Sequence, residues 1–316
     1  QDGNNVGVCA VKGNFDDCQS GVKKIFTDSD VTEMLDKNGM MFSSANSINW
    51  GRLVPQIVYY ISAYATLAAD KEIEYGEKIN IVVPTGNFGN ILAAYYAKRM
   101  GLPVNRLICA SNINKVLTDF INTGVYDRNR EFFATCSPSM DILISSNLER
   151  LLYILTGEDD SLINEWFTAL AKDGKYEVND EVKQLLAKDF AAGFCDDADT
   201  KKTISEIFEK YSYTCDTHTA VAVKVYEEYK AATGDNTKTL IASTASPYKF
   251  SASVLEAIQG KKSDMDEYSM IDELNKISKL DIPQSLAELK NKERRFKDSI
   301  SSTDMKEYVV KNLGLN

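Results

Sequence analysis

The sequence predicts an α/β fold built on a parallel sheet with flanking helices. A strand, a glycine turn, a helix and a second strand follow one another within residues 78–110, which is the pattern of a βαβ unit with a right-handed crossover. A further apolar, β-branched segment at 239–242 has the character of a third strand. Elsewhere apolar residues recur mostly at helical spacing, so helices are expected to cover the sheet.

The N-terminal part begins with an apolar run at 6–11 that Gly13 ends, which predicts a strand. Apolar positions at helical spacing predict a helix over 17–26. Residues 28–42 are polar and irregular, and no regular element is assigned to them. From 50 to 69 apolar residues occur nearly all round the helical wheel, which is typical of a buried helix.

The central part contains the βαβ unit. Residues 78–84 (KINIVVP) form an apolar run typical of a buried strand, and the turn TGNFGN follows it. A helix is expected over 91–100, because Gly101 and Pro103 then stop it. A second strand is expected over 106–110.

The pattern from 141 to 212 is almost wholly helical and predicts a helical insertion. Its helices are expected at 147–155, 160–171, 179–194 and 203–211. A further helix is expected over 219–232, ahead of the third strand. We therefore predict two domains, a smaller α/β part at 1–75 and a larger α/β part at 76–316 that carries the insertion.

Charge and cysteine usage exclude several classes of function. The chain has 36 Lys and Arg against 46 Asp and Glu, a net charge of −10, so electrostatics do not favour nucleic acid or anionic lipid. A single histidine, His218, excludes a His-rich metal cage, and no metal site is expected. No segment has the length and apolar character of a membrane span. The six cysteines contain no Cys-x-x-Cys pair and are typical of reduced thiols in a cytoplasmic protein.

The turn in VVPTGNFGN, residues 82–90, is the strongest candidate for a binding site. Gly86 and Gly89 stand where a strand gives way to a helix, and there backbone N–H groups and the helix dipole favour an anion such as phosphate. The alternative is a tight βα turn that needs glycine for its dihedral angles. The lysine of a P-loop and the third glycine of the dinucleotide fingerprint are missing.

Two polar segments accompany this turn. Asn46, Ser47, Asn49 and Arg52 precede or open the helix at 50–69, and they offer donors for phosphate or carboxylate or, alternatively, a helix cap with a surface arginine. Thr244 follows the third strand, and its hydroxyl either faces a ligand at the carboxyl edge of the sheet or caps the next turn. His218 has no identified partner and is most simply structural, although a general base is the alternative.

In this order the motifs resemble those of threonine synthase, the pyridoxal-phosphate enzyme that converts O-phospho-L-homoserine and water to L-threonine and phosphate by elimination and hydration. The resemblance extends from residue 13 to 250. It is carried by GNFDDCQ (13–19), NSINWGR (46–52), PTGNFGN (84–90), SPSMDILISSNLERLL (137–152), DTHTA (216–220) and STASPYKF (243–250).

The resemblance implies a type II pyridoxal-phosphate enzyme fold with the cofactor between two α/β domains. It implies that the cofactor phosphate is bound by Gly86, Asn87, Phe88, Gly89 and Asn90. Thr244 then falls on the hydroxyl partner of the pyridine nitrogen, which leaves that nitrogen unprotonated. Asn46, Ser47, Asn49 and Arg52 become candidates for binding O-phosphohomoserine.

One part of the family pattern is missing from these 316 residues. The Schiff-base lysine and its Ser-Gly-Asp-Thr-Gly segment lie upstream of the GNFDDCQ motif in the family, and Lys249 is not that lysine. The chain therefore resembles a C-terminal portion, without a catalytic residue of its own, and we expect it to be inactive alone. A monomer is expected, because nothing in the sequence resembles an added regulatory domain. The alternatives are another type II pyridoxal-phosphate lyase or a non-catalytic binder of a phosphorylated metabolite.

Overall fold

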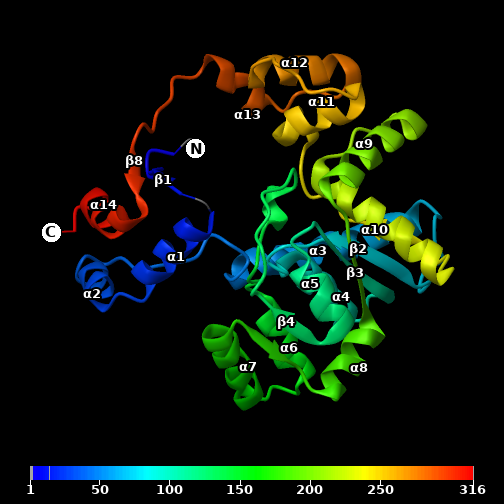
Figure 1. Cartoon of the computed structure of the whole chain (residues 1–316), viewed down its shortest axis with the longest axis horizontal. Helices are drawn as coiled ribbons and strands as arrows, with labels where there is room; N and C mark the ends of the chain where they lie inside the picture. Colours follow the sequence, from blue (N-terminus) through cyan, green and yellow to red (C-terminus); the bar gives the residue numbers. More distant parts are fainter. Residues whose placement is uncertain (1–2, 14, 316) are drawn as a thin grey trace. The chain divides into compact units, whose positions relative to one another are not determined.

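The computed structural model describes residues 3–13 and 15–315, without the side chains of residues 15, 16, 19 and 20. The chain forms two compact units (Figure 1). The terminal unit consists of residues 1–44 and 283–316, and the central unit consists of residues 45–282. The GNFDDCQ motif includes residue 14 and lies partly outside the described residues.

The central unit is built on a four-stranded parallel sheet in the order β6-β3-β2-β7. The strands are β6 (Phe190–Phe194), β3 (Val104–Ser111), β2 (Ile79–Pro84) and β7 (Thr239–Ile241). Val82 of β2 is in register with Ile108 on one side and with Ile241 on the other. Because the strands are parallel, their carboxyl ends lie at one edge. The predicted parallel α/β fold is confirmed.

Every residue of β2 is buried, which explains its continuous apolar sequence. The side chains of successive residues pack into two hydrophobic cores, one on each face of the sheet. Ile81 and Val83 pack with Leu92 of α4 (Gly89–Arg99). Val82 packs on the other face with Val221 of α10 (Thr217–Thr233). Helices on both faces therefore fix the strand that leads into the glycine turn.

The helix expected at 179–194 is wrong over its last residues, 190–194. Helix α8 ends at Asp189 (Asp180–Asp189), and β6 begins at the next residue. This segment pairs with β3, where Phe190 is in register with Leu107, so sheet pairing decides its conformation. A Cβ on Gly193 would lie 2.9 Å from Cγ1 of Val225 in α10, so this strand and helix pack closely. The region 141–212 is therefore not a purely helical insertion.

The other elements of the central unit follow the sequence pattern more closely. The helices expected at 50–69, 147–155, 160–171 and 203–211 are confirmed. They are α3 (Trp50–Ala69), α6 (Leu148–Leu155), α7 (Asp160–Asp173) and α9 (Asp197–Tyr211). The sequence analysis did not identify α5 (Val116–Thr123), the hairpin of β4 (Val125–Asp127) and β5 (Lys175–Glu177), η1 (Pro138–Met140), η2 (Pro247–Phe250), α11 (Ser251–Gln259) or α12 (Glu267–Ser278). Among the described residues, none of the helices combines the length and apolar character needed to cross a membrane.

The terminal unit joins the two ends of the chain. Strand β1 (Ala10–Lys12) pairs in parallel with β8 (Ser299–Ser301). Helix α2 (Ser29–Lys37) lies in the segment to which the sequence analysis assigned no element. Asp28 caps this helix, and its Val31 and Leu35 enter the local core. The remaining elements are α1 (Phe15–Phe26), α13 (Gln284–Ala287), η3 (Glu288–Asn291), η4 (Ser302–Asp304) and α14 (Met305–Asn312).

The compact units differ from the predicted ranges 1–75 and 76–316. Helix α3 belongs to the central unit because its Leu53, Ile57 and Tyr60 lie in the same core as Leu92 of α4. Residues 283–316 belong with the N-terminus, since β8 pairs with β1.

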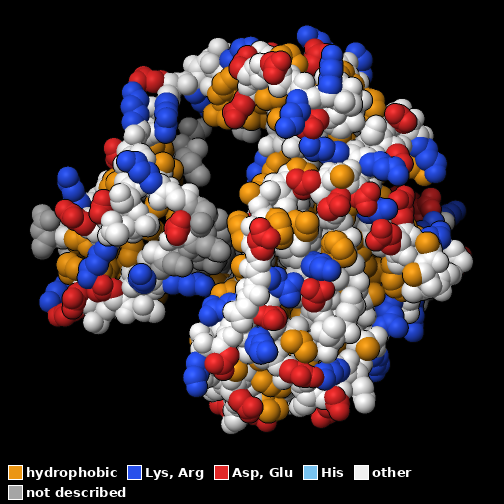
Figure 2. Space-filling view, in the orientation of Figure 1, with side chains coloured by type: hydrophobic (Ala, Val, Ile, Leu, Met, Phe, Trp, Pro, Cys, Tyr) orange, Lys and Arg blue, Asp and Glu red, His pale blue; other side chains and the backbone are white. Residues whose placement is uncertain are grey.

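Figure 2 shows Asp and Glu side chains interspersed with Lys and Arg over the visible face.

Candidate functional site

The candidate site is the turn at 85–90, between β2 and α4. Phe88 precedes α4 with φ of 62°, and it provides no side-chain cap for that helix. A buried aromatic residue in this left-handed conformation is uncommon and often marks a functional turn. Within the described part of the chain, the backbone amides of Gly86, Asn87 and Phe88 donate no hydrogen bond. They form an open set of donors at the N-terminus of α4, and we call residues 86–90 the amide cradle.

Packing, rather than backbone dihedral angles, requires the two glycines of the cradle. The positive φ belongs to Phe88, and neither Gly86 nor Gly89 has one. A Cβ on Gly86 would lie 2.5 Å from the backbone oxygen of Ser139, and a Cβ on Gly89 would overlap the hydroxyl of Ser47. Two other segments therefore approach the cradle too closely for any side chain.

Thr244 follows β7, the strand next to the one that leads into the cradle. Strand β7 adjoins β2, and the amide of Ala242 donates to the carbonyl of Val82 at 2.9 Å. Both strands end at the same edge, so residues 85–90 and 243–244 follow the carboxyl ends of neighbouring strands. The side chain of Thr244 is exposed. This edge is where open α/β sheets bind ligands.

Of the four residues predicted to bind substrate, Ser47 contacts the cradle, at Gly89. Asn49 caps α3 by accepting from the amide of Gly51 at 2.9 Å. Asn46 accepts from the amide of Ile48 at 3.0 Å, and Arg52, which is exposed, donates to the carbonyl of Ala45 at 2.6 Å. Asn49 and Arg52 thus have the local roles that the alternative interpretation expected.

Sequence reasoning assigned no role to three residues that the structure places behind the cradle. Ser145 Oγ donates to the carbonyl of Gly86 at 2.9 Å. Asn147 Nδ2 donates to the carbonyl of Asn87 at 2.9 Å and to Ser47 Oγ at 3.0 Å. Arg150 Nη1 donates to Asn147 Oδ1 at 2.9 Å and to the carbonyl of Ser47 at 3.0 Å. The motif at 137–152 contained them, but its spacing does not reveal these long-range contacts.

A buried polar network holds the segment that packs on Gly86. Asp141 accepts from Asn112 Nδ2 at 2.7 Å and from Thr135 Oγ1 at 2.7 Å. Asn112 follows β3, so the network ties residues 135–141 to the same edge of the sheet. Ser139 is thereby fixed close to Gly86, and the shape of the cradle depends on this segment.

His218 is engaged at both ring nitrogens. Its Nε2 accepts from the amide of Ser139 at 3.2 Å, and its Nδ1 lies 3.3 Å from Asp216 Oδ1. The two contacts together favour the tautomer with the proton on Nδ1. Burial acts to raise the pKa of Asp216, but hydrogen bonds from His218 and Thr219 outweigh it and lower that pKa. This arrangement supports the structural interpretation of His218.

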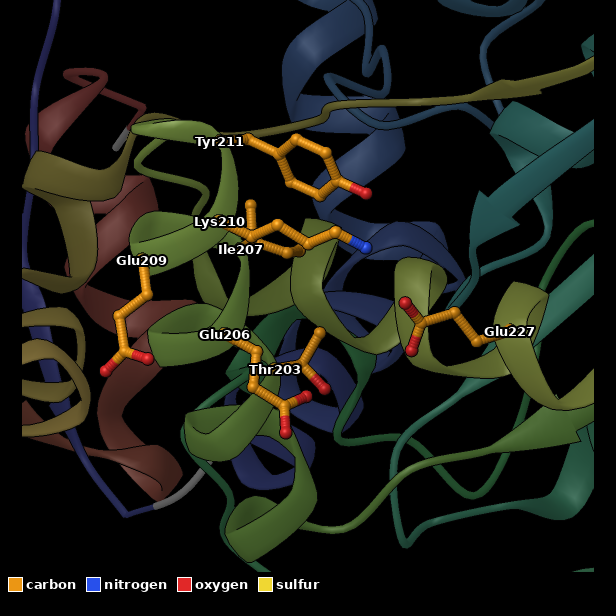
Figure 3. A pocket seen from close by; sticks show the side chains of 7 residues that line it. All are labelled: Thr203, Glu206, Ile207, Glu209, Lys210, Tyr211 and Glu227. Carbon is orange, nitrogen blue, oxygen red and sulfur yellow. The ribbon is translucent and has the colours of Figure 1, made fainter.

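A separate cavity of about 460 Å³ lies on α9 and α10. The side chains of Lys210 and Glu227 extend into it from these two helices (Figure 3). None of the predicted site residues lines it. Within the described residues, no group of three or more His, Cys, Asp or Glu side chains is placed to hold a metal ion.

The buried cysteines are expected to be unreactive in the folded chain. Desolvation raises the pKa of Cys109, Cys195 and Cys215 to about 12. Because the thiolate is the nucleophile, iodoacetamide at pH 8 should alkylate these three thiols at least ~100-fold more slowly than in denaturant. Peptide mass mapping with and without urea measures this, with Cys9 and Cys18, which are half-buried, as internal references. Rapid modification of Cys109 in the folded chain would contradict the packing.

The parallel sheet with helices on both faces, and the open amide cradle at its carboxyl edge, place the chain in the class of α/β proteins with an open parallel sheet, which generally bind ligands at that edge. A family model described as "Threonine synthase, C-terminal" matches residues 219–309. Over these residues the chain is similar to the C-terminal part of threonine synthases.

Full-length proteins and a solved structure show the same similarity over most of this chain. The chain is 40% identical over 298 residues to threonine synthase-like 1 of Homo sapiens, covering 93% of the chain and 40% of that protein. It is 38% identical over 291 residues to threonine synthase of Saccharomyces cerevisiae, covering 87% and 55%. The structure of a threonine synthase from Brucella melitensis, described as bound to PLP, aligns with a TM-score of 0.78 and 34% identity over 96% of the chain and 59% of that structure. The chain thus spans between 40% and 59% of the length of these proteins.

Proposed function

We propose that the chain binds the phosphate of pyridoxal 5'-phosphate as part of a threonine synthase. In this proposal the whole enzyme converts O-phospho-L-homoserine and water to L-threonine and phosphate. The amide cradle of residues 86–90 is the observation that carries the proposal. Its amides at Gly86, Asn87 and Phe88 have no hydrogen-bond acceptor within the described residues, and a helix dipole points at them.

The residues present fit a phosphate ester. Gly86 and Gly89 stand where Ser139 and Ser47 leave no space for a Cβ. Because neither residue has a side chain, nothing from them blocks access of a phosphate to the backbone N–H groups. Phe88 directs its ring inward against Phe190, with ring centroids 6.1 Å apart, and leaves its amide available. When bound, the cofactor's pyridine ring withdraws electron density from the substrate, which supports elimination of phosphate and addition of water.

We assign Thr244 to the pyridine ring of the cofactor and the segment at 46–52 to the substrate. Thr244 is proposed to hydrogen-bond the ring nitrogen, because it follows the strand next to the cradle and its side chain is exposed. Ser47 is the best supported of the substrate candidates, since it contacts Gly89. Asn46, Asn49 and Arg52 each use a side-chain atom in a local hydrogen bond, so they are less well supported. The monomeric state and cytoplasmic location remain predictions.

The proposal is tested first by binding. Equilibrium dialysis of the chain with pyridoxal phosphate and with pyridoxal, which lacks the phosphate, should show at least ~100-fold tighter binding of the phosphorylated form, since it alone makes charge-assisted hydrogen bonds to the cradle. Phosphorus NMR reports whether the phosphate is bound. Equal affinity for the two compounds would contradict the proposal.

The second test is turnover. We expect no threonine from O-phosphohomoserine with these 316 residues alone, and turnover when they are joined to an N-terminal threonine synthase segment that carries the Schiff-base lysine. Colorimetric phosphate release and amino-acid analysis measure the two products. Turnover by the chain alone would show that the assignment of the lysine to an upstream segment is wrong. Phosphate binding without turnover in both versions would favour the non-catalytic binder.

A further inference from the structure

We propose that Ser145 and Asn147 are positioning residues that orient the amides of the cradle. The inference rests on the proposed function, because it concerns how the same site recognises phosphate. Its basis is a set of hydrogen bonds on the far side of two peptide groups, at the carbonyls of Gly86 and Asn87.

The geometry of a trans peptide makes the connection between carbonyl and amide. The carbonyl of one residue and the N–H of the next belong to one rigid plane and point in opposite directions. Ser145 Oγ binds the carbonyl of Gly86, so it also fixes the direction of the Asn87 amide. Asn147 binds the carbonyl of Asn87, so it fixes the direction of the Phe88 amide. Two side chains thereby set two donors of the cradle.

Asn147 hydrogen-bonds the cradle and does not cap the helix that follows it. An asparagine directly before a helix normally accepts a hydrogen bond from an amide of the first turn. Asn147 precedes α6 and makes no such cap. Both its backbone amide and its Nδ2 donate to the carbonyl of Asn87, at 3.1 and 2.9 Å. Its Oδ1 accepts from Arg150 instead, and the side chain is fully buried.

The two residues are themselves held rigidly. The amide of Ser145 donates to the hydroxyl of Tyr126 at 2.8 Å, and Tyr126 in turn donates to the carbonyl of Leu143 at 3.0 Å. Arg150 binds Asn147 and also the carbonyl of Ser47. Because Ser145, Tyr126 and Asn147 are all buried, their hydrogen bonds persist without competition from water. The amides are therefore oriented before a ligand arrives, and binding costs less entropy.

The test compares Ser145→Ala and Asn147→Ala with Ser146→Ala. Ser146 is a matched control, since it lies between them and, among the described residues, its hydroxyl donates to the side-chain oxygen of Asn87 at 3.4 Å and to no backbone carbonyl of the cradle. Binding of pyridoxal phosphate and of pyridoxal to the whole chain is measured for each variant. We expect Ser145→Ala to weaken pyridoxal phosphate about 10-fold, the loss of one hydrogen bond, and to leave pyridoxal unchanged. Asn147→Ala should weaken pyridoxal phosphate less, because the backbone amide at 147 still donates to the carbonyl of Asn87. Ser146→Ala should change neither affinity.

The ratio of the two affinities separates positioning from general damage. Equal weakening of both compounds would show a structural role only and would overturn the inference. An unchanged ratio in Ser145→Ala, with the wild-type preference for the phosphate intact, would also overturn it while leaving the proposed function in place. Absence of that preference in the wild-type chain would instead refute the proposed function. Should Asn147→Ala unfold, Ser145→Ala alone decides, because its side chain is small and its removal leaves little space.

Discussion

Replacing Gly86 by aspartate is expected to abolish binding of the cofactor phosphate. The new Cβ would lie 2.5 Å from the backbone oxygen of Ser139, so the cradle or the segment at 137–140 must move. The added carboxylate also stands close to a bound phosphate, and repulsion between two charges about 4 Å apart is worth roughly 4 kcal/mol at the edge of a protein. The loss corresponds to about 1,000-fold in affinity, measured by dialysis with pyridoxal phosphate.

Two further variants separate the effects of charge and volume. Gly86→Ala introduces the steric conflict alone, and we expect it to weaken binding but less than aspartate does. Gly7→Asp adds the same charge where nothing lies within 4 Å of the new Cβ, and it should have no effect on binding. Retention of wild-type affinity in Gly86→Asp would show that the phosphate is bound elsewhere. The thermal unfolding of each variant checks that the fold persists.

The βαβ unit was predictable from the sequence because each of its signals is local. The apolar run of β2 reflects burial on both faces, and the turn after it was marked by Gly86 and Gly89. Phosphate binding was also inferred there, and the alternative was a tight turn that needs glycine for its dihedral angles. The glycines avoid collisions with Ser139 and Ser47, which come from distant parts of the chain, and the unusual backbone angle belongs to Phe88.

Strand β6 was not predictable, because its conformation depends on a neighbour. The sequence FAAGF follows α8 without a proline or a turn, so the helical pattern continues into it. Pairing with β3 selects the extended form, and Gly193 allows α10 to pack closely. Local preference was overridden by tertiary contacts, as is common for short strands.

The residues behind the cradle could not be identified for a related reason. Ser145 and Asn147 reach carbonyl oxygens 59 and 60 positions earlier in the chain. Side-chain bonds to backbone carbonyls leave no pattern in the sequence, because any backbone position offers the same acceptor. Thr244 was easier to place, because strand ends share an edge in any parallel sheet. The resemblance supplied the motif at 137–152 but not the roles of its members.

A large loss of folding stability is expected when Asp216, which caps α10, is replaced. Its carboxylate accepts from the amides of His218 and Thr219 and from the hydroxyl of Thr219, and it is fully buried. Asp216→Ala removes the cap and leaves these buried donors without partners, which should lower the free energy of unfolding by about 3 kcal/mol. Since α10 packs on β2 and β3, the carboxyl edge of the sheet loses support as well.

Asp266 offers a matched control at the surface. It caps α12 in the same way, accepting from the amides of Tyr268 and Ser269 and from the hydroxyl of Ser269, but it is exposed. Water can replace these bonds, so Asp266→Ala should cost about 1 kcal/mol. Urea unfolding of both variants gives the comparison. Equal losses would show that burial does not add to the energy of the cap at Asp216.

The contribution of Asp216 should depend on pH in a defined direction. Hydrogen bonds from His218 and Thr219 keep its pKa in the folded chain below the ordinary value, despite the opposing effect of burial. The stabilisation is therefore complete above the unfolded pKa of about 3.9, and it is lost as the pH falls through the lower folded pKa. The difference in unfolding free energy between wild type and Asp216→Asn should be constant from pH 8 to 5 and should shrink below pH 4. A difference that grows on acidification would mean that burial dominates and that the carboxyl group is held in its protonated form.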